Sequence, residues 1–410
     1  MQDGGNMAQL VSGPAPGSST PRYFDQVLKL AQRMDSGMLD IVLPDGQRVS
    51  LKGDKPGPKV ELTVHNPEMF SRIIRQGVLG FAEGYLDGDW STDNLQGLLD
   101  NLYSEIDHFY EAAPGAGIVR AYERLRFWLQ SNSRRQAKKN ISYHYDLGND
   151  FYALWLDDTM TYSAAIFETG QESLEQAQNA KYKSMVDQMG AQPGDHVLEI
   201  GCGWGGFAEY AAKERGLRVT GLTISQEQHD FAVARMQRLG LSDMVDIRLQ
   251  DYRDETGQYD GIVSIEMFEA VDEKYWPVYF ETLRKCLKPG KNATLQIITM
   301  DDERFESYRK TVDFIQKYIF PGGMLPSPGI LRDQAQAQGL KVVRSVEFAD
   351  GYSQTLRRWH ETFNEHWTQI SGMGFDERFR RMWNFYLTSC AASFRTRNSD
   401  VTQITIARPA

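Results

Sequence analysis

The sequence has few of the features that mark disulfide-rich, metal-binding or membrane-spanning proteins. Its 410 residues include only three cysteines, Cys202, Cys286 and Cys390, with no C-x-x-C pair. Neither a disulfide framework nor a metal site is therefore predicted. No segment approaches the roughly 18 consecutive apolar residues of a membrane span. Residues 1–21 lack the charged and apolar regions of a signal peptide, so we expect a disordered amino terminus and a cytoplasmic protein.

Basic residues are also in deficit, because 45 Lys and Arg stand against 55 Asp and Glu, for a net charge of −10. This balance argues against a general nucleic-acid binder. Residues 120–140 are the exception, with seven basic side chains and the single acid Glu123 among aromatic and leucine residues. Such a segment suits an anionic membrane surface. A solvated helix followed by a basic linker would have the same composition, so both interpretations stay open.

The most informative segment is residues 197–208, where an apolar strand runs into a glycine-rich turn that opens a helix. Gly201, Gly203 and Gly205 let the backbone approach a ligand at the carboxyl end of a first parallel strand. Glu199 lies two residues before the first glycine, a pattern that favours S-adenosylmethionine over a dinucleotide. The alternative is a glycine turn kept only for tight packing of the strand against the helix.

A second segment supports the same cofactor. The strand predicted at 218–222 is followed by Thr223, where a dinucleotide-binding unit usually has an acid for the ribose hydroxyls. Gln228, on the next helix, is a candidate to supply that hydrogen bond instead.

The order of elements predicts a two-domain α/β protein. A smaller amino-terminal α+β domain is expected at 22–119, and a Rossmann-like methyltransferase domain at 141–410, joined by a basic amphipathic linker at 120–140. In the smaller domain we expect a hairpin at 40–49 and a strand at 60–64. In the larger domain we expect strands at 195–200, 218–222, 245–249, 261–265, 293–298 and 340–343, and helices at 226–239 and 276–286.

Six motifs suggest a family, and they occur in order at residues 143–150, 160–163, 201–205, 250–253, 264–269 and 318–327. Together they resemble the cyclopropane fatty acid synthase family, which uses S-adenosylmethionine to alkylate double bonds in lipid acyl chains. The resemblance covers nearly the whole chain. Residues 77–90 look like the amino-terminal domain of the bacterial members that act on phospholipids.

The resemblance implies a set of cofactor contacts. Tyr162 and Ser163 would contact the cofactor from a lid, and Asp251 and Tyr252 would flank the adenine. The methionine part would be surrounded by Val197, Leu198, Glu199, Ile200, Gly201, Cys202, Gly203, Trp204 and Gly205. The ribose would be held by Thr223, Ile224, Ser225 and Gln228.

The family's base is a bound bicarbonate, which the resemblance makes a further candidate ligand here. Glu269 and Tyr352 match two of its ligands, and Ile298 matches a backbone contact. The ligand histidine is replaced by Gln296 and the cysteine of the lid by Ala164. An amide or a backbone N–H can still donate to the anion.

Two further residues carry hypotheses. Glu266 stands where the family commonly has glycine, and we expect it to help remove the proton, either replacing bicarbonate or working beside it. The alternative is a cap or ion pair for the following helix. Cys390 matches a cysteine sometimes assigned as catalytic in the family. Because the reaction needs no thiolate, a small buried side chain is the competing interpretation.

The expected function is that of a cyclopropane-fatty-acyl-phospholipid synthase, whose lid (141–168) and insertion (301–330) enclose an acyl channel. The substrate would be an unsaturated acyl chain of a membrane phospholipid, reached from the inner face of the membrane. The main alternative is a C-methyltransferase that makes a methylated or methylene-branched chain. A methyltransferase for a small soluble metabolite and a silent lipid-binding paralogue are the remaining alternatives. The smaller domain is a candidate surface for a homodimer.

Overall fold

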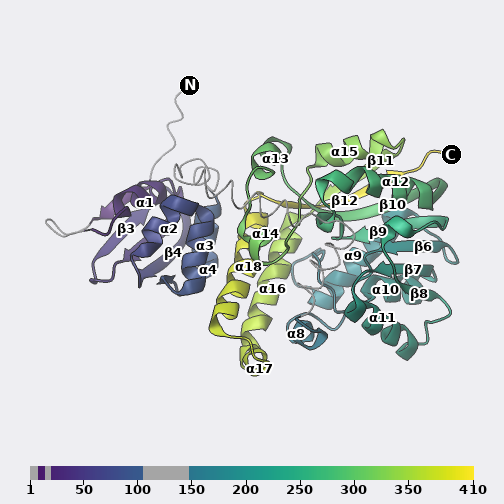
Figure 1. The fold of residues 1–410 in the computed structure, drawn as a ribbon, viewed down its shortest axis with the longest axis horizontal. Helices are drawn as coiled ribbons and strands as arrows, with labels where there is room; N and C mark the ends of the chain where they lie inside the picture. The colour runs from purple at the N-terminus through teal and green to yellow at the C-terminus, as the bar shows by residue number, and fades with distance from the viewer. Residues whose placement is uncertain (1–7, 14–19, 105–146) are drawn as a thin grey trace. The chain divides into compact units, whose positions relative to one another are not determined.

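The computed structural model describes residues 8–13, 20–104 and 147–410. The chain folds into two compact units (Figure 1). The basic segment 120–140 and the first lid residues, 141–146, lie outside the described residues. The first unit contains the described residues 8–13, 20–104, 311–315 and 367–398, and the second contains 147–310, 316–366 and 399–410.

The first unit is built on a five-stranded sheet with the order β1-β3-β2-β4-β5. Strands β2 and β3 form the antiparallel hairpin predicted from the sequence, and β2 pairs with β4 in parallel. The strands are β1 (Gln9–Ser12), β2 (Ser36–Val42), β3 (Arg48–Lys52), β4 (Lys55–Val64) and β5 (Trp90–Ser91), and the helices are α1 (Phe24–Ala31), α2 (Glu68–Gln76), α3 (Val78–Asp87), α4 (Leu95–Tyr103), α17 (Trp367–Gly372) and α18 (Glu377–Arg395).

Two features of this unit differ from the sequence-based expectation. Residues 9–12 form β1 instead of continuing a disordered terminus, because their backbone pairs with β3. Helix α18, expected within the carboxy-terminal domain, belongs to the first unit. It packs against α4, where the guanidinium of Arg395 lies 2.9 Å from the carboxylate of Asp100. Phe385 on the same helix packs against Tyr85 of α3, with ring centroids 6.0 Å apart.

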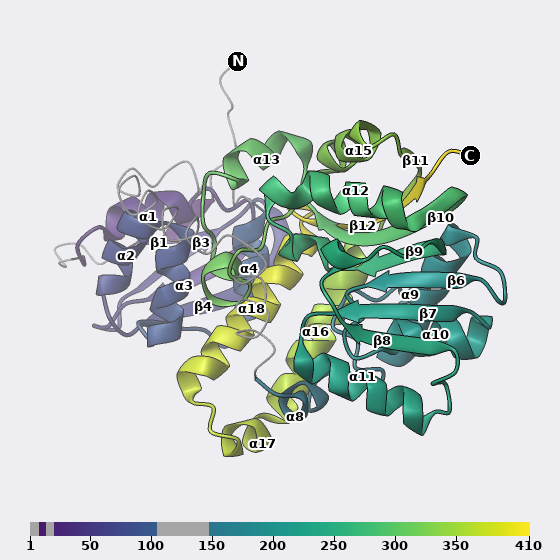
Figure 2. The same cartoon turned by 45° about the vertical axis from the view of Figure 1, so that its right-hand side comes forward.

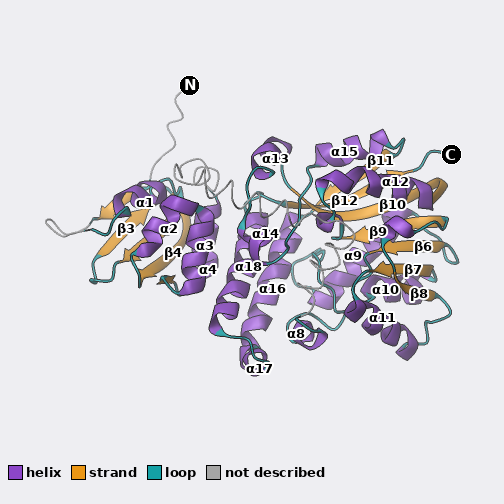
Figure 3. Ribbon diagram, in the orientation of Figure 1, coloured by secondary structure: helices purple, strands orange, loops and turns teal. Residues whose placement is uncertain are grey.

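The second unit contains a seven-stranded sheet with the order β11-β12-β10-β9-β6-β7-β8 (Figure 3). All six predicted strands are present, and β12, which was not predicted, pairs antiparallel with β10 and β11. The strands are β6 (His196–Ile200), β7 (Arg218–Thr223), β8 (Val245–Leu249), β9 (Tyr259–Ile265), β10 (Leu287–Thr299), β11 (Lys341–Glu347) and β12 (Asp400–Ala407). This arrangement confirms the Rossmann-like α/β expectation.

Helices cover both faces of this sheet (Figure 2). Alternate residues of β6 point to opposite faces: Val197 packs in a core with α9 and α10, and Leu198 packs in a second core with α12. The helices of this unit are α8 (Asn149–Ala153), α9 (Leu174–Met189), α10 (Gly206–Arg215), α11 (Gln226–Arg238), α12 (Trp276–Cys286), α13 (Asp302–Tyr308), α15 (Pro328–Ala337) and α16 (Ala349–Glu365). Helix α14 (Phe314–Tyr318) begins in the first unit and ends in the second. Among the described residues, none of the helices is both long and apolar enough to span a bilayer.

Candidate active site

The glycine turn after β6 leaves part of its backbone open. Gly201, Gly203 and Gly205 have φ angles of 84°, 51° and 84°, in the left-handed region that favours glycine. A Cβ on Gly201 would lie 2.7 Å from the side chain of Met267, whereas a Cβ on Gly203 would meet no heavy atom within 4 Å. The turn therefore needs glycine at 201 for packing, and it leaves space beside 203 for a ligand.

Glu199 adds an unsatisfied polar group in the same region. Its side chain is buried, and its Oε2 atom has no hydrogen-bond partner. Burial raises the pKa of this carboxyl well above its usual range, although the charges of Lys181 and Arg235 oppose the shift. A buried carboxyl oxygen without a partner fits a ligand that brings a donor or a positive charge.

The segment after β7 is held in a fixed conformation. The hydroxyl of Thr223 donates to Oε1 of Gln228 at 3.0 Å, and Ser225 caps α11 by accepting from the backbone N–H of Gln228. These three side chains are buried, whereas Ile224 is partly exposed. The amide of Gln228 is thus oriented before any ligand binds.

Asp251 and Tyr252 lie on the loop, residues 250–258, that connects β8 to β9. The carboxylate of Asp251 accepts from Arg253 Nε at 2.8 Å, and the ring of Tyr252 packs against Tyr279 with centroids 5.4 Å apart. Both side chains are therefore supported by neighbours, and their contact with adenine stays a prediction.

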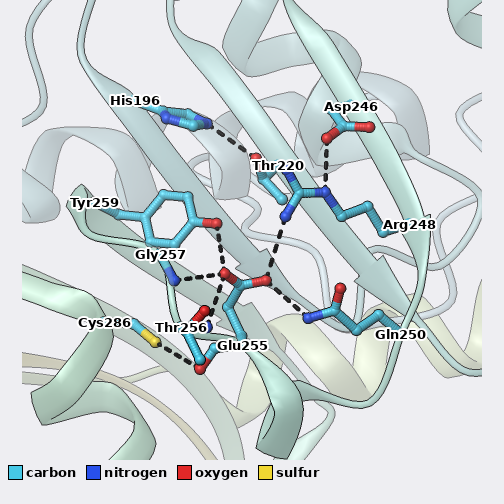
Figure 4. Close-up of polar contacts among 10 residues, drawn as sticks. All are labelled: His196, Thr220, Asp246, Arg248, Gln250, Glu255, Thr256, Gly257, Tyr259 and Cys286. Carbon is cyan, nitrogen blue, oxygen red and sulfur yellow. Dashed lines mark hydrogen bonds and ion pairs between the residues drawn. The ribbon is translucent and has the colours of Figure 1, made fainter.

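Glu255 holds the loop between β8 and β9 through several hydrogen bonds (Figure 4). Its carboxylate accepts from Gln250 at 2.9 Å, from the hydroxyl of Tyr259 at 3.1 Å and from the backbone N–H of Gly257 at 2.7 Å. Burial alone would raise the pKa of Glu255, but these hydrogen bonds lower it. The ionised Glu255 therefore fixes the path of the chain that carries Asp251 and Tyr252.

Aromatic side chains surround the lid residue Tyr162. Its ring centroid lies 5.2 Å from Trp359, 5.5 Å from Trp155 and 5.6 Å from Tyr152. The ring of Tyr152 also contacts Trp204 of the glycine turn, at 5.0 Å. This cluster joins the lid to the turn and forms an apolar wall beside it.

Glu266, at the carboxyl end of β9, is the centre of the site. Its φ of 49° is rare for a residue with a side chain. Its Oε1 accepts from the backbone N–H of Ala164 and from Nε2 of Gln296, both at 2.8 Å, and the hydroxyl of Tyr352 also hydrogen-bonds to the carboxylate. Burial raises the pKa of Glu266, while these donors and the charge of Lys181 oppose the rise.

Glu269 differs from Glu266 in its partners. Its Oε1 accepts from the backbone N–H of Ile298, but its Oε2 is buried without a hydrogen-bond partner. Burial, followed by the nearby charge of Glu266, raises the pKa of Glu269 to about 8. At neutral pH Glu269 therefore holds a proton, while Glu266 has the donors that favour a carboxylate. Glu266 and Glu269 therefore differ in protonation, and such a difference suits one acid to act as a base and the other to remain a neutral group.

The donors that the resemblance assigned to bicarbonate are taken by protein groups. Gln296 uses both amide hydrogens, one to Glu266 and one to the carbonyl of Ala164 at 3.2 Å. Its Oε1 accepts from Gln403 at 3.0 Å. The N–H groups of Ala164 and Ile298 donate to Glu266 and Glu269. The carboxylate of Glu266 thus takes hydrogen bonds that an anion would take.

Cys390 lies on α18 and is only partly buried as a residue, and its role in the reaction stays a prediction. Burial raises the pKa of the Cys390 thiol, and the charge of Asp313 adds to the rise. Burial likewise raises the pKa of Cys202 well above its usual range. Neither thiol is suited to act as a thiolate.

The sequence analysis missed two buried polar residues of the site, Lys181 and Gln403. Lys181 donates to Ser163 Oγ at 2.6 Å, and Gln403 orients Gln296. The sequence did contain a signal for Lys181. It is a charged residue on the same helix face as Ala177, Tyr182 and the other buried residues of α9. Gln403 gave no signal, because β12 itself was not predicted.

The sheet order, the open glycine turn and the unsatisfied Glu199 define an S-adenosylmethionine-dependent methyltransferase. Residues 132–404 match the family model described as mycolic acid cyclopropane synthetase. The chain therefore belongs to the cyclopropane fatty acid synthase family and is an enzyme of that type.

Named relatives agree with this assignment. The chain is 40% identical over 367 residues to tuberculostearic acid methyltransferase UfaA1 of Mycobacterium tuberculosis, a match that covers 85% of this chain and 83% of UfaA1. It is 36% identical over 374 residues to cyclopropane-fatty-acyl-phospholipid synthase of Escherichia coli, covering 88% and 90% of the two chains. The solved structure of the cyclopropane synthase MmaA2 of M. tuberculosis matches with a TM-score of 0.62 and 31% identity, over 66% of this chain and 98% of MmaA2. CmaA1, solved with SAH and CTAB, gives a TM-score of 0.61 and 32% identity, over 66% and 97%.

Proposed function

We propose that the protein transfers a methyl group from S-adenosylmethionine to the double bond of an unsaturated phospholipid acyl chain, and that Glu266 is the base. The main support for this role of Glu266 is that three groups, from Ala164, Gln296 and Tyr352, donate hydrogen bonds to its carboxylate. In the family these positions surround bicarbonate. Glu266 therefore replaces the anion in this chain.

The residues present fit the cofactor. The open backbone at Gly203 and the unpartnered Oε2 of Glu199 would face its methionine part, and Gln228 would bind its ribose. When bound, the cofactor supplies a methyl group on a sulfonium centre. Tyr162 and the lid would orient it from the opposite side. The aromatic wall of Tyr152, Trp155 and Trp359 would exclude water, which a weakly nucleophilic alkene requires.

Methyl transfer to an alkene leaves a carbocation, and the chain must stabilise it and then remove a proton. The ring faces of Tyr352 and Phe320 are candidates for cation–π stabilisation. The Glu266 carboxylate takes the proton, and its donors and the charge of Lys181 oppose the rise in its pKa that burial causes. Glu269, with a pKa of about 8, stays protonated at neutral pH and adds no second negative charge.

Two products follow from the same carbocation. A proton lost from the transferred methyl closes a cyclopropane ring, the product expected from the sequence. If a hydride shifts first and a neighbouring proton is lost, the product is a methylene-branched chain. Two observations favour this second candidate: the donors of the anion site hydrogen-bond to Glu266, and the chain is 40% identical to a protein named tuberculostearic acid methyltransferase.

The lipid setting is part of the proposal. The seven basic residues within 120–140 suit an anionic membrane surface, which would bring the enzyme to phospholipid at the inner face of the membrane. A homodimer through the smaller unit would double the basic segments at that surface. Binding to vesicles with and without anionic lipid tests the attachment, and sedimentation tests the dimer.

Product analysis tests the function. The purified protein is incubated with S-adenosylmethionine and vesicles of mono-unsaturated phospholipid, and the released acyl chains are examined by mass spectrometry and NMR. A gain of one CH₂ with cyclopropane ring protons assigns ring closure, and the same gain with vinylic protons assigns C-methylation. Unmodified chains from a protein that binds the cofactor would refute the proposed function.

A further inference from the structure

A buried lysine lies next to the proposed base, and the reaction as described does not use it. Lys181 on α9 is 0% exposed. Its Nζ donates to Ser163 Oγ at 2.6 Å and to Gln178 Oε1 at 2.5 Å. A lysine is almost never fully buried unless it is paired, and neither of these two acceptors carries a charge.

The charges that face Lys181 come from three other elements. They are Glu266 at the end of β9, Asp157 in the turn after α8, and Glu199 on β6, with Glu266 the strongest influence. The ammonium of Lys181 is therefore a counter-charge that these buried acids share, and Arg235 also acts on Glu199.

Lys181 and Glu266 also hold two adjacent residues of the lid. Lys181 binds the side chain of Ser163, and Gln178 donates to the carbonyl of Ser163 at 3.0 Å. Glu266 accepts from the N–H of the next residue, Ala164. The Ser163–Ala164 turn is thus held on one side by α9 and on the other by Glu266. Removing Lys181 would therefore affect Glu266 in two ways, by moving the turn that binds it and by removing a nearby positive charge.

We propose that Lys181 is a positioning residue that fixes the Ser163–Ala164 turn and keeps the Glu266 carboxylate ionised by placing a buried ammonium beside it. This inference rests on the proposed function of Glu266 as the base. Lys181 touches neither the acyl chain nor the reacting carbon in this account. It acts only through Ser163 and Glu266.

The proposal predicts a pH-dependent defect. Burial lowers the pKa of Lys181 to about 7, against the opposing charge of Glu266, so its ammonium acts mainly below that pH. Without it the pKa of Glu266 rises, because an opposite charge nearby lowers a carboxyl pKa by about one unit or more. The acid limb of kcat/KM in Lys181→Met should therefore move up by about one pH unit or more. The loss should grow as the pH falls, approach about tenfold or more well below the acid limb, and be much smaller at pH 8.5.

Two variants serve as references. Lys183→Met removes an exposed lysine of the same helix, which pairs with Asp187 at 2.6 Å, and should leave the profile unchanged. Lys181→Arg keeps a charge and should hold the acid limb at or below its wild-type position. If Lys181→Met does not fold, the acid limb of kcat/KM in Lys181→Arg tests the proposal instead. An equal loss at pH 6 and pH 8.5, or an acid limb of Lys181→Arg that rises by about one unit, would overturn the proposal.

An infrared titration separates this proposal from the proposed function. The difference spectrum between the wild type and Glu266→Gln identifies the Glu266 carboxyl band without any lipid. In Lys181→Met its titration midpoint should rise, and an unchanged midpoint overturns the role of Lys181. Unmodified acyl chains from the wild type would instead refute the proposed function while this titration still stands.

Discussion

The backbone N–H of Ala164 donates a 2.8 Å hydrogen bond to the carboxylate of Glu266. This contact joins the lid to the end of β9. Gln296 donates to the same oxygen atom. On the proposed function Glu266 is the enzyme's own base, and this proposal has measurable consequences.

Replacing Glu266 by glycine should separate activity from stability. The left-handed φ of 49° costs a residue with a side chain about 1 kcal/mol, which glycine avoids. This relief offsets only part of the cost of the lost hydrogen bonds, so the unfolding free energy should fall by about 2–4 kcal/mol while the protein still folds. Turnover should fall by about 100-fold or more, the usual contribution of a general base. Denaturant melts and product assays check both parts, and a fully active Glu266→Gly would show that the base lies elsewhere.

Replacing Gly203 by alanine should weaken cofactor binding without unfolding the protein. The added methyl enters space that is open in the structure and that the cofactor would fill. Gly190, at the end of α9, is the matched control, because it also has a positive φ and an open Cβ direction. Both variants should lose about 1 kcal/mol of stability, and only Gly203→Ala should lose affinity for S-adenosylmethionine in calorimetry. Equal affinities in the two variants would place the cofactor elsewhere.

Glu269 should make the cofactor-free protein less stable as the pH rises. A pKa of about 8 in the folded state, above its ordinary value of 4.5, means that the folded state binds more protons between these values. The unfolding free energy therefore falls as the pH rises through this window. In Glu269→Gln the fall should be smaller between pH 6 and 8.5, as thermal melts would show.

Glu255→Gln is the control with the opposite sign. The lowered pKa of Glu255 means that its stabilising contribution is complete above its ordinary value and is lost only as the pH falls below it. Glu255→Gln should therefore lose the same stability at pH 6 and at pH 8.5. If Glu269→Gln keeps the full wild-type pH dependence, Glu269 is ionised in the folded protein.

Cys390→Ala should keep wild-type turnover. Burial raises the pKa of the Cys390 thiol, so the thiolate is scarce. Initial rates with unsaturated vesicles check this, with Cys390→Ser as a second variant of similar size. A loss of turnover at unchanged thermal stability would give the thiol a role in the reaction.

The sequence predicted the parts of the fold that follow from local pattern. The strand and glycine turn around Gly201 and the helix at 276–286 were placed correctly, because apolar runs and glycine spacing specify them. The packing of α18 against α4 was not predicted, since its partners on α4 lie almost 300 residues earlier in the chain. No local pattern can show such a pairing.

The site was predicted to a similar extent. The sequence analysis grouped Glu266, Glu269, Gln296 and Tyr352 by resemblance to the family. In the structure Glu266 hydrogen-bonds to Gln296 and Tyr352, and its charge raises the pKa of Glu269. The sequence could not show that both amide hydrogens of Gln296 are donated to other groups of the protein. The orientation of this amide depends on its partners Gln403 and Ala164, which only the structure shows. The sequence analysis also left out Lys181, because burial of a lysine on α9 depends on the packing of other elements around it.

Bicarbonate dependence tests the central claim most directly. Methyl transfer to unsaturated vesicles is measured in buffer depleted of carbon dioxide and again with added bicarbonate, for the wild type and for Glu266→Gly. The account predicts a wild-type rate that does not change, and a Glu266→Gly rate that bicarbonate partly restores through the freed donors of Ala164 and Gln296. A wild-type enzyme that stops without bicarbonate and recovers with it would contradict the role of Glu266 as the base.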